Sequence, residues 1–514
     1  MEPKVQANDD GTLTISITLS AASDAVSMLT QEERLMEAIN AVGRAGAAHL
    51  LAGFDTQGQP LLHAGRKWTS KGRVAKIYET PWGEVILHRH LDQHSGGGAT
   101  LCPLETGARI VGGSATPHLA RSLGHQYANN NARAVVRDLE ENHARKLAPS
   151  DVADIAQAIA EAAGQPLVEQ NAHAPQSAPA EVASAVLGLD GTCALFCGEG
   201  FKQCMVGTIA LYDGEGERLE TIYLGQAPEM GKAQFLDRLD GEWQRVCQRY
   251  PQARRAGLTD GARDYEPWLA ARTDWQILDF YHASGYLAGA APGIERHKAA
   301  RAEWLEEACH TLQHEAGAAA RLSGELAAQA EAGARTRGAA PALAAASGYF
   351  THNLERMNYA VFRAMALPIG SGVTEAACKT LVKLRLCGSG MKWTRSGAQT
   401  VITLRALLLS TSRWTSLWTY FDKNGFHSHE PINYLHPFDG TPGRNAVCLS
   451  QALFFFLQAL PAPGQLRFVA HAVDAGQLRL AQDHHGCGPD PGSGPAWPWR
   501  WPCLPKPLSL PACS

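Results

Sequence analysis

Residues 182–191 read VASAVLGLDG, an apolar run that closes on an acidic residue and a glycine, and this run decides the fold. Short apolar runs bounded by turn residues are typical of buried strands. Four further runs of this kind follow: QCMVGTIALYD (203–213), RLETIYLGQ (218–226), ARRAGLTDG (253–261) and DWQILDFYH (274–282). The stretch therefore predicts five strands, of which the first, fourth and fifth end in Asp190, Asp260 and Asp279.

Helical patterns separate the last three strands. Residues 230–246 (MGKAQFLDRLDGEWQRV) are amphipathic, and residues 265–272 (YEPWLAAR) predict a shorter helix. The order of three strands, a helix, a strand, a helix and a strand is that of an α/β RNase H-like domain. Residues 290–346 are rich in Ala, Glu and Arg and predict an all-α insertion. A coiled arm is the alternative, which the Gly and Pro interruptions disfavour.

Asp190, Asp260 and Glu375 are the candidate catalytic residues and metal ligands. Two-metal phosphodiester chemistry needs carboxylates that converge from separate elements, because Mg²⁺ prefers oxygen ligands. Both aspartates precede a glycine, and neighbouring parallel strands would place them side by side. Glu375 lies in LPIGSGVTEAACK (367–379), in the first turn of a helix that follows a glycine loop. The alternative is that the aspartates form turns and that Glu375 only complements the helix dipole.

A set of ordered motifs covers most of residues 76–425. The motifs are YETPWGEVILHRHL (78–91), ATLCPLE (99–105), LDGT (189–192), LTDGA (258–262), QILDFYHASGYL (276–287), RMNYAVFRAMALPIGSGVTEAACKTLVKLR (356–385), GSGMKWTRSGAQTVITLRALLLS (388–410) and RWTSLWTYF (413–421). Together they resemble the bacterial insertion-sequence transposases of the ISKra type, which are related to the Mutator-like DDE transposases.

This resemblance implies a function for the three acids. Asp190, Asp260 and Glu375 would form the catalytic triad, with two Mg²⁺ or Mn²⁺ ions as cofactors. The substrate would be double-stranded DNA, both the terminal repeats of the element and the target. Cleavage at the element end would be followed by attack of the freed 3′ hydroxyl on target DNA, without ATP. We also expect a homo-oligomer on the DNA, in the bacterial cytoplasm and at the nucleoid.

Asp279 and His282 form a D-x-x-H pattern at the end of the last predicted strand. One interpretation gives His282 a supporting catalytic role, orienting the scissile DNA or a leaving hydroxyl. The other is that Asp279 caps the helix that starts near Tyr281 and that His282 packs against it. We favour Asp260 over Asp279 as the second catalytic acid, because its strand should neighbour that of Asp190. Asp279 is expected to lie farther from the metals.

Residues 376–426 form a basic segment interleaved with tryptophans. It holds eight Lys or Arg residues against one acid, Asp422: Lys379, Lys383, Arg385, Lys392, Arg395, Arg405, Arg413 and Lys423. In an α-helix, Lys379 and Lys383 would share the face of Glu375. We therefore expect DNA phosphates to be bound by Lys379, Lys383, Arg385, Lys392 and Arg395. The alternative is a solvated surface with structural tryptophans.

Helices are predicted for most of the chain before the catalytic domain, which we place at residues 183–426. Residues 1–114 contain a helix at 31–51 and a β-hairpin at 76–92, whose Pro-Trp-Gly-Glu forms the turn. A linker rich in Gln, Ala and Pro follows at 164–182.

Residues 115–163 predict a helical region of their own. Two helices within residues 132–162, the second capped by Ser150, resemble a helix-turn-helix that binds DNA. A plain αα-hairpin is the alternative, because such hairpins are common.

The bulk composition excludes several classes of protein. The net charge of −4 excludes a polycation, so DNA contacts must come from a local basic surface. The first residues lack a signal-peptide pattern, and no apolar run approaches the roughly 20 residues that span a bilayer. Twelve cysteines without a CxxC pair indicate reduced thiols. His88, His90, His94 and Cys102 offer zinc ligands, but alternating histidines are more often simply exposed.

Residues 427–514 differ from the rest of the chain. They hold 13 prolines and a WPWRWPCLP run, and the motifs stop near Phe426. We expect a disordered or non-native extension; a small subdomain around 448–482 is the alternative. Two rival functions also stand: an RNase H-like nuclease acting on branched DNA, and a catalytically silent DNA-binding descendant of a transposase.

Overall fold

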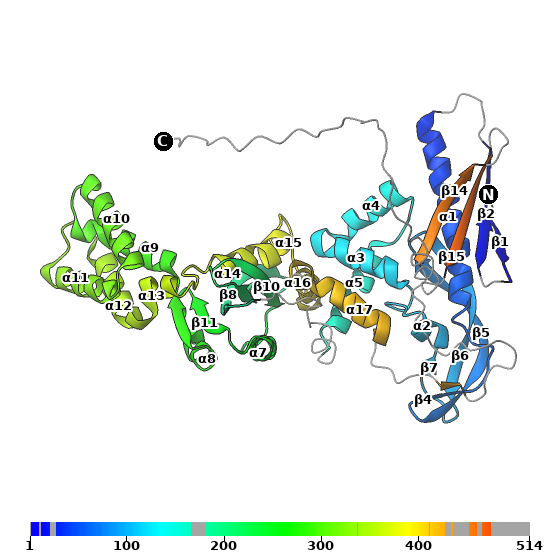
Figure 1. Cartoon of the computed structure of the whole chain (residues 1–514), viewed down its shortest axis with the longest axis horizontal. Coiled ribbons are helices and arrows are strands. Elements are labelled where there is room, and N and C mark those ends of the chain that lie inside the picture. The colour runs from blue at the N-terminus through cyan, green and yellow to red at the C-terminus, as the bar shows by residue number, and fades with distance from the viewer. Residues whose placement is uncertain are drawn as a thin grey trace, which may run out of the picture.

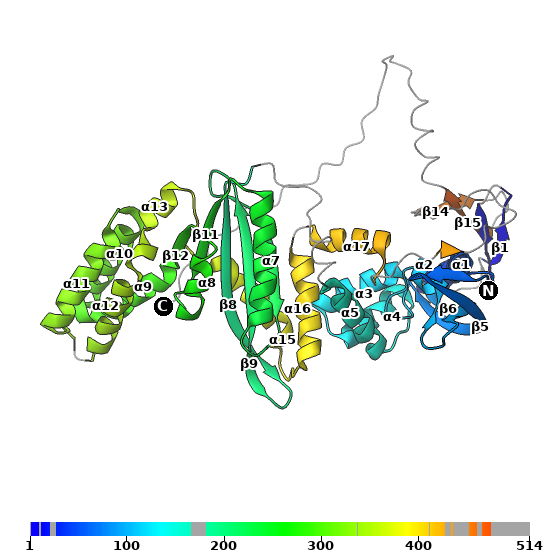
Figure 2. The same cartoon turned by 90° about the horizontal axis from the view of Figure 1, so that it is seen from below.

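The computed structural model describes residues 2–9, 12–20, 27–165, 181–336, 338–410, 412–426, 433–434, 452–459 and 465–473. The protein is mixed α/β, with sheets that are also of mixed direction. Its N-terminal sheets, a three-helix unit, a central sheet and a helical bundle follow one another along the long axis (Figures 1 and 2).

The central sheet has five strands. They are β8 (Ser184–Phe196), β9 (Gly200–Tyr212), β10 (Arg218–Gln226), β11 (Arg254–Thr259) and β12 (Trp275–Leu278). The order across the sheet is β10-β9-β8-β11-β12. β9 pairs antiparallel with β8 and β10, whereas β11 pairs parallel with β8 and β12. The five predicted strands are all present, and the strand that carries Asp190 neighbours the one that precedes Asp260.

Helix α7 (Ala233–Arg249) connects β10 to β11 and covers one face of the sheet (Figure 2). Its apolar residues recur at helical spacing, so Phe235, Leu239 and Trp243 are buried together against β8 and β9. Gly207 of β9 permits this close approach, because a Cβ there would lie 2.9 Å from Leu239. A long crossover of this kind is what lets β11 run parallel to β8.

Helices after the sheet form an all-helical bundle. They are α9 (Phe280–Ile294), α10 (Lys298–His314), α11 (Ala318–Ala332), α12 (Ala340–Asn353) and α13 (Tyr359–Ala364), while the short α8 (Glu266–Ala270) lies between β11 and β12. The bundle shares one core with the edge of the sheet, in which Leu287, Leu322 and Phe350 pack with Ile277. The helical region starts before residue 290, where the insertion was predicted to begin, because Asp279 already caps α9.

The chain then returns to the other face of the sheet. The elements are α14 (Gly372–Ala377), a π-helix (Cys378–Lys383), α15 (Leu384–Leu386), α16 (Arg395–Leu409) and α17 (Arg413–Asn424). Val206 of the sheet is buried in one core with Leu381 and Ile402 of these helices. The central sheet is therefore covered by helices on both faces.

The N-terminal region is built on a long hairpin. Its elements are β1 (Lys4–Ala7), β2 (Leu13–Ser16), β3 (Thr18–Ser20), α1 (Met28–Ala52), β4 (Leu61–His63), β5 (Arg66–Thr80), β6 (Gly83–His94), β7 (Thr100–Leu101) and α2 (Pro103–Gly107). β5 and β6 form the predicted hairpin, which starts ten residues earlier than expected, and belong to a sheet of order β13-β4-β5-β6-β7.

Three helices fill residues 115–163: α3 (Pro117–Asn129), α4 (Ala132–His143) and α5 (Pro149–Ala163), of which α4 and α5 are the two helices predicted within residues 132–162. The predicted cap of α5 is wrong, since Pro149 is its first residue and Ala148 its N-cap.

The exposed face of α5 is acidic. Asp151, Asp154 and Glu161 face solvent, while Ile155 and Ile159 pack into a core shared with α16 and α17. Carboxylates on the exposed face would repel DNA phosphates, so α5 does not suit a DNA-reading helix. The arrangement favours the plain helical packing that was the alternative.

Two predicted segments lie mainly outside the described residues. Of the linker at 164–182, residues 166–180 are not described, and of the tail at 427–514 three strands are described: β13 (Asn433–Tyr434), β14 (Ala452–Ala459) and β15 (Gln465–Val473). β14 pairs with β15, and β15 with β3. Among the described residues, no helix is both long and apolar enough to cross a membrane.

Candidate active site

Asp190 lies within β8, and Asp260 directly follows the neighbouring strand β11. β8 and β11 pair as far as Gly188 and Leu258, and each aspartate follows that pair by two residues. β8 does not end at Asp190, as predicted, but continues to Phe196, paired with β9. Asp190 therefore lies where β8 loses β11 as a neighbour. Asp190 is half-buried and Asp260 is exposed, so solvent reaches both carboxylates.

Hydrogen bonds orient both aspartates. The Gly191 N–H donates to Asp190 Oδ1 over 2.6 Å, and the Ala262 N–H donates to Asp260 Oδ1 over 3.0 Å. The second oxygen of Asp190 accepts from the Cys378 thiol, 3.4 Å away. Burial raises the pKa of this thiol, and the neighbouring charge of Asp190 raises it further, so Cys378 stays a neutral donor.

Glu375 is carried by α14, which packs directly on β8 and β9. Thr374 Oγ1 lies 2.7 Å from Thr208 Oγ1 of β9, and both hydroxyls are buried. A Cβ on Gly188 would lie 2.2 Å from Thr374 Oγ1, so glycine is required for the helix to come this close. The contact holds Glu375 beside the strand of Asp190, and its side chain is 54% exposed.

Asp279, His282 and Glu375 form a cluster at the start of α9. Their ligand atoms all lie within 4.8 Å of one another, the one such group of three among the described residues. Asp279 Oδ1 accepts from the His282 N–H over 2.7 Å and lies 3.1 Å from His282 Nδ1. Asp279 Oδ2 accepts from the Ser371 N–H, and the Ser371 hydroxyl donates to Glu375 Oε1 over 2.7 Å.

Asp279 thus caps α9 and also holds the loop before Glu375. We expected Asp279 to lie farther from the metals than the three candidates, yet it lies close to Glu375, and Ser371 joins the two carboxylates. Burial alone would raise the pKa of Asp279, but the hydrogen bonds from Ser371 and His282 bring it below the ordinary value. Asp279 is completely buried with both oxygens engaged, whereas Asp260 is exposed. Neither Asp190 nor Asp260 belongs to the group of three ligand residues described above, whereas Asp279 does.

The position of His282 is compatible with both roles considered for it, packing against the helix cap and supporting catalysis. Its backbone and ring both contact Asp279, as the capping interpretation requires. Its ring is 44% exposed, and Nδ1 lies 4.0 Å from Glu375 Oε1. His282 is therefore placed to contact a group bound at Glu375.

Tyr349 is a residue that the sequence did not single out. Its hydroxyl donates to the backbone carbonyl of Asp260 over 3.3 Å, and its ring stacks on Tyr286 with centroids 3.8 Å apart. The bundle therefore touches the loop that carries Asp260. No local sequence signal marks this contact, because α12 is 89 residues away along the chain.

The basic residues predicted to bind DNA divide into exposed and buried ones. Lys379, Lys383 and Lys392 are exposed. Arg395 is half-exposed and forms an ion pair with Glu199 at 2.6 Å.

Arg385 cannot contact DNA in this structure. It is 4% exposed, and its guanidinium donates to the carbonyls of Tyr127 and Asn130. It also packs over the rings of Tyr127 and Trp393. Arg385 therefore ties the segment that follows Glu375 to α3.

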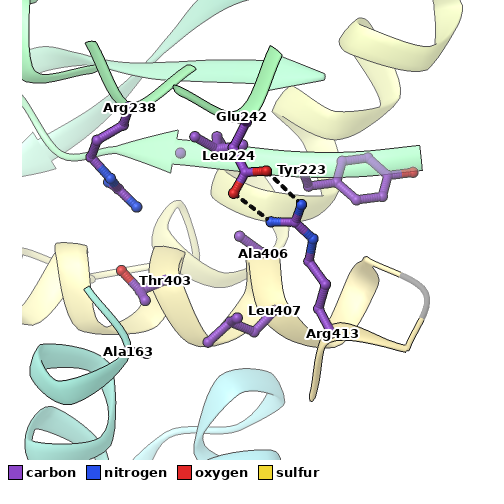
Figure 3. A pocket seen from close by; sticks show the side chains of 10 residues that line it. Ala163, Tyr223, Leu224, Arg238, Glu242, Thr403, Ala406, Leu407 and Arg413 are labelled. Carbon is purple, nitrogen blue, oxygen red and sulfur yellow. Dashed lines mark hydrogen bonds and ion pairs between the residues drawn. The ribbon is translucent and has the colours of Figure 1, made fainter. Parts of the chain in front are cut away.

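Arg405 and Arg413 are structural as well. Arg405 donates to the Thr380 and Ala128 carbonyls from a buried position. Arg413 forms a bidentate pair with Glu242 of α7, with bonds of 2.8 and 2.7 Å. Figure 3 shows this pair bridging the small pocket between β10, α7 and α16.

A π-helix changes the relation of Lys379 and Lys383 to Glu375. Residues Cys378–Lys383 adopt it, and the Leu384 N–H bonds to the Lys379 carbonyl five residues back. The prediction that the three side chains share one face assumed a continuous α-helix, so it no longer follows. π-turns are rare and occur frequently at functional sites.

Strand β5 carries a basic surface that the sequence analysis missed. Arg66, Lys67, Lys71 and Arg73 are exposed, and no carboxylate in the described part of the chain pairs with them. The signal was present: no acidic residue occurs from 56 to 78.

The zinc ligands considered for β6 do not converge. His88 and His90 occupy one face of the strand. Cys102 is buried against the other face, in a core with Tyr78 and Leu104. His94 packs edge-on against Trp68.

Comparisons with protein-family models and with curated proteins found no match for this sequence.

Proposed function

We propose that the chain is a DDE transposase, which cuts and rejoins DNA in a metal-dependent reaction. The observation that carries the proposal is the placement of three solvent-reachable carboxylates. Asp190 lies on β8, Asp260 directly follows the adjacent parallel strand β11, and Glu375 is held beside the first by a helix packed on Gly188. The strand order, three antiparallel strands followed by two parallel ones, is that expected of an RNase H-like core.

The donor set fits the ions that such a reaction requires. Asp190, Asp260 and Glu375 offer carboxylate oxygens, the ligands that Mg²⁺ and Mn²⁺ prefer. None of the three is fully buried, in contrast to Asp279. Two bound ions would activate the attacking oxygen and stabilise the leaving one.

The chain's own residues position these ligands. The Cys378 thiol and the Gly191 N–H hold the two oxygens of Asp190. Ser371 holds Glu375 and is itself held by Asp279. Each ligand therefore has a preset orientation, which lowers the reorganisation needed when substrate binds.

Two exposed basic surfaces would bind the DNA backbone. One consists of Lys379, Lys383 and Lys392, on the segment that follows Glu375. The other is the basic surface of β5. Lys and Arg contacts to phosphates supply affinity without reading sequence.

Cleavage of DNA that carries the terminal repeats flanking the gene tests the proposal. In Mg²⁺ or Mn²⁺ the wild-type chain should nick the repeat end and join it to a second duplex. Joining distinguishes a transposase from a nuclease for branched DNA, which would cut such junctions and join nothing. Binding of the repeats without any nicking, even after removal of residues 427–514, would favour the silent descendant.

A further inference from the structure

A polar enclosure lies in the N-terminal region, away from the three catalytic candidates. After α1 the chain crosses the face of β6 that carries the even-numbered residues. His90 marks the crossing: its N–H donates to Asp55 Oδ1 over 3.0 Å, and its Nδ1 lies 3.1 Å from Asp55 Oδ2. Gly58 has a φ of +76°, and a Cβ there would lie 3.2 Å from His90 Nε2. Glycine thus lets the loop close over the outer nitrogen of this imidazole.

Asp92 is buried without a hydrogen-bond partner. It lies two residues after His90, on the same face of β6, and opposite Ser70 of β5. Its exposure is 0%, and neither carboxylate oxygen has a donor. Burial raises the pKa of Asp92, while the neighbouring His90 lowers it and Asp55 raises it. The two charged groups that act on Asp92 are therefore those of this enclosure.

Gln59 supplies a further oxygen of the same kind. Its side-chain Oε1 is buried and has no partner, and it directly follows Gly58 at the crossing. Buried polar atoms in proteins are almost always paired, so the three unpaired oxygens of Asp92 and Gln59 need an explanation. A buried carboxylate is destabilising unless a cation or a donor compensates its charge.

We infer that His90, Asp92 and Gln59 bind a divalent transition-metal cation, with Asp55 orienting His90. The Asp55 carboxylate accepts from Nδ1, which leaves Nε2 as the ligand atom. A carboxylate behind a metal-bound histidine is a common arrangement, because it fixes the tautomer of the ring. A histidine nitrogen and carboxylate oxygens are donors that Zn²⁺ accepts.

Such a cation would stabilise the conformation in which β5 exposes its basic surface. The register of β5 and β6 shifts between Ser70 and Arg73, so Lys71 and Gly72 bulge out next to Asp92. The inference does not depend on the proposed reaction, since none of its residues belongs to the candidate active site.

Zinc binding and thermal unfolding of the full chain test the inference. We take the variant in which Asp190, Asp260 and Glu375 are replaced by Asn, Asn and Gln, strip it of metal, and titrate it with ZnCl₂. One equivalent should bind, and the unfolding temperature should rise with its concentration. His90→Gln and Asp92→Asn should each abolish both effects. Asp55→Asn should weaken zinc binding by roughly 10–100-fold, as loss of an orienting carboxylate does.

Controls keep the test decisive. His88→Gln, an exposed histidine on the same face of β6, should leave zinc binding unchanged. Metal-free Asp92→Asn should be at least as stable as its metal-free parent, because it removes an uncompensated buried charge. No bound zinc in the parent variant would overturn the inference. Zinc binding that survives Asp92→Asn would overturn it too, as would a response to Ca²⁺ alone.

Discussion

Replacement of Asp279 by Asn should destabilise the protein far more than loss of an ordinary helix cap. Asp279 accepts hydrogen bonds from the Ser371 N–H, the His282 N–H and the His282 ring while completely buried. Asn retains one acceptor oxygen but directs an amide N–H₂ at one of these donors. A hydrogen bond to a charged group contributes about 1.5–3 kcal/mol, and an unpaired buried donor costs a similar amount. We expect a loss of ~2–4 kcal/mol in the free energy of unfolding, against ~1 kcal/mol for a cap alone.

The effect should depend on pH with a defined sign. The folded-state pKa of Asp279 lies below its ordinary value, so its carboxylate stabilises the native state above the unfolded pKa. That contribution is lost as the pH falls through the folded-state value. The difference between wild type and Asp279→Asn should therefore be full at neutral pH and shrink below about pH 4.

Urea unfolding, followed by tryptophan fluorescence at pH 7 and at pH 3.5, measures both effects. Asp274→Asn is the matched control, because Asp274 is exposed five residues upstream; it should change stability by less than about 0.5 kcal/mol. An equal loss in the free energy of unfolding for Asp279→Asn and Asp274→Asn would refute the reasoning. So would a loss for Asp279→Asn that is independent of pH.

Three further predictions concern the packing and the basic surfaces. Charge reversal at both Lys379 and Lys383 should weaken DNA binding on all sequences and lower the salt slope by about 2; an unchanged slope would mean a solvated surface. Gly188→Ala should cost ~1–3 kcal/mol in thermal unfolding, with recovery by Thr374→Ala, and a silent substitution would show that α14 is not packed as described. Arg413→Met should destabilise by about 1.5–3 kcal/mol in urea without altering the salt slope of DNA binding, because Glu242 loses the bonds from Arg413 but keeps its ion pair with Arg245; a changed slope would return Arg413 to the DNA surface.

The five strands and the crossover helix were predictable because their patterns are local. Apolar runs between turn residues marked each strand, and helical spacing marked α7. The extension of β8 past Asp190 was not predictable. Gly191 looks like a strand end in the sequence, but the chain stays extended because β9 continues to pair with it.

Burial of charged side chains could not be predicted from composition. Arg385 and Arg413 counted as basic surface, yet each is buried with partners far away in the chain. The π-helix after Glu375 depends on its packing against β8 and is equally invisible in the local pattern. The acidic face of α5 is visible in the sequence, since Asp151 and Glu161 fall outside its apolar stripe.

The central claim is that Asp190, Asp260 and Glu375 act together as metal ligands. The most direct measurement is Mg²⁺- or Mn²⁺-dependent cleavage of repeat-bearing DNA by the wild type and by Asp190→Asn, Asp260→Asn and Glu375→Gln, with DNA binding measured in parallel. We predict that each variant loses cleavage while binding stays nearly intact, and that double variants lose no more than single ones. Substantial cleavage by any one of the three variants would contradict the account.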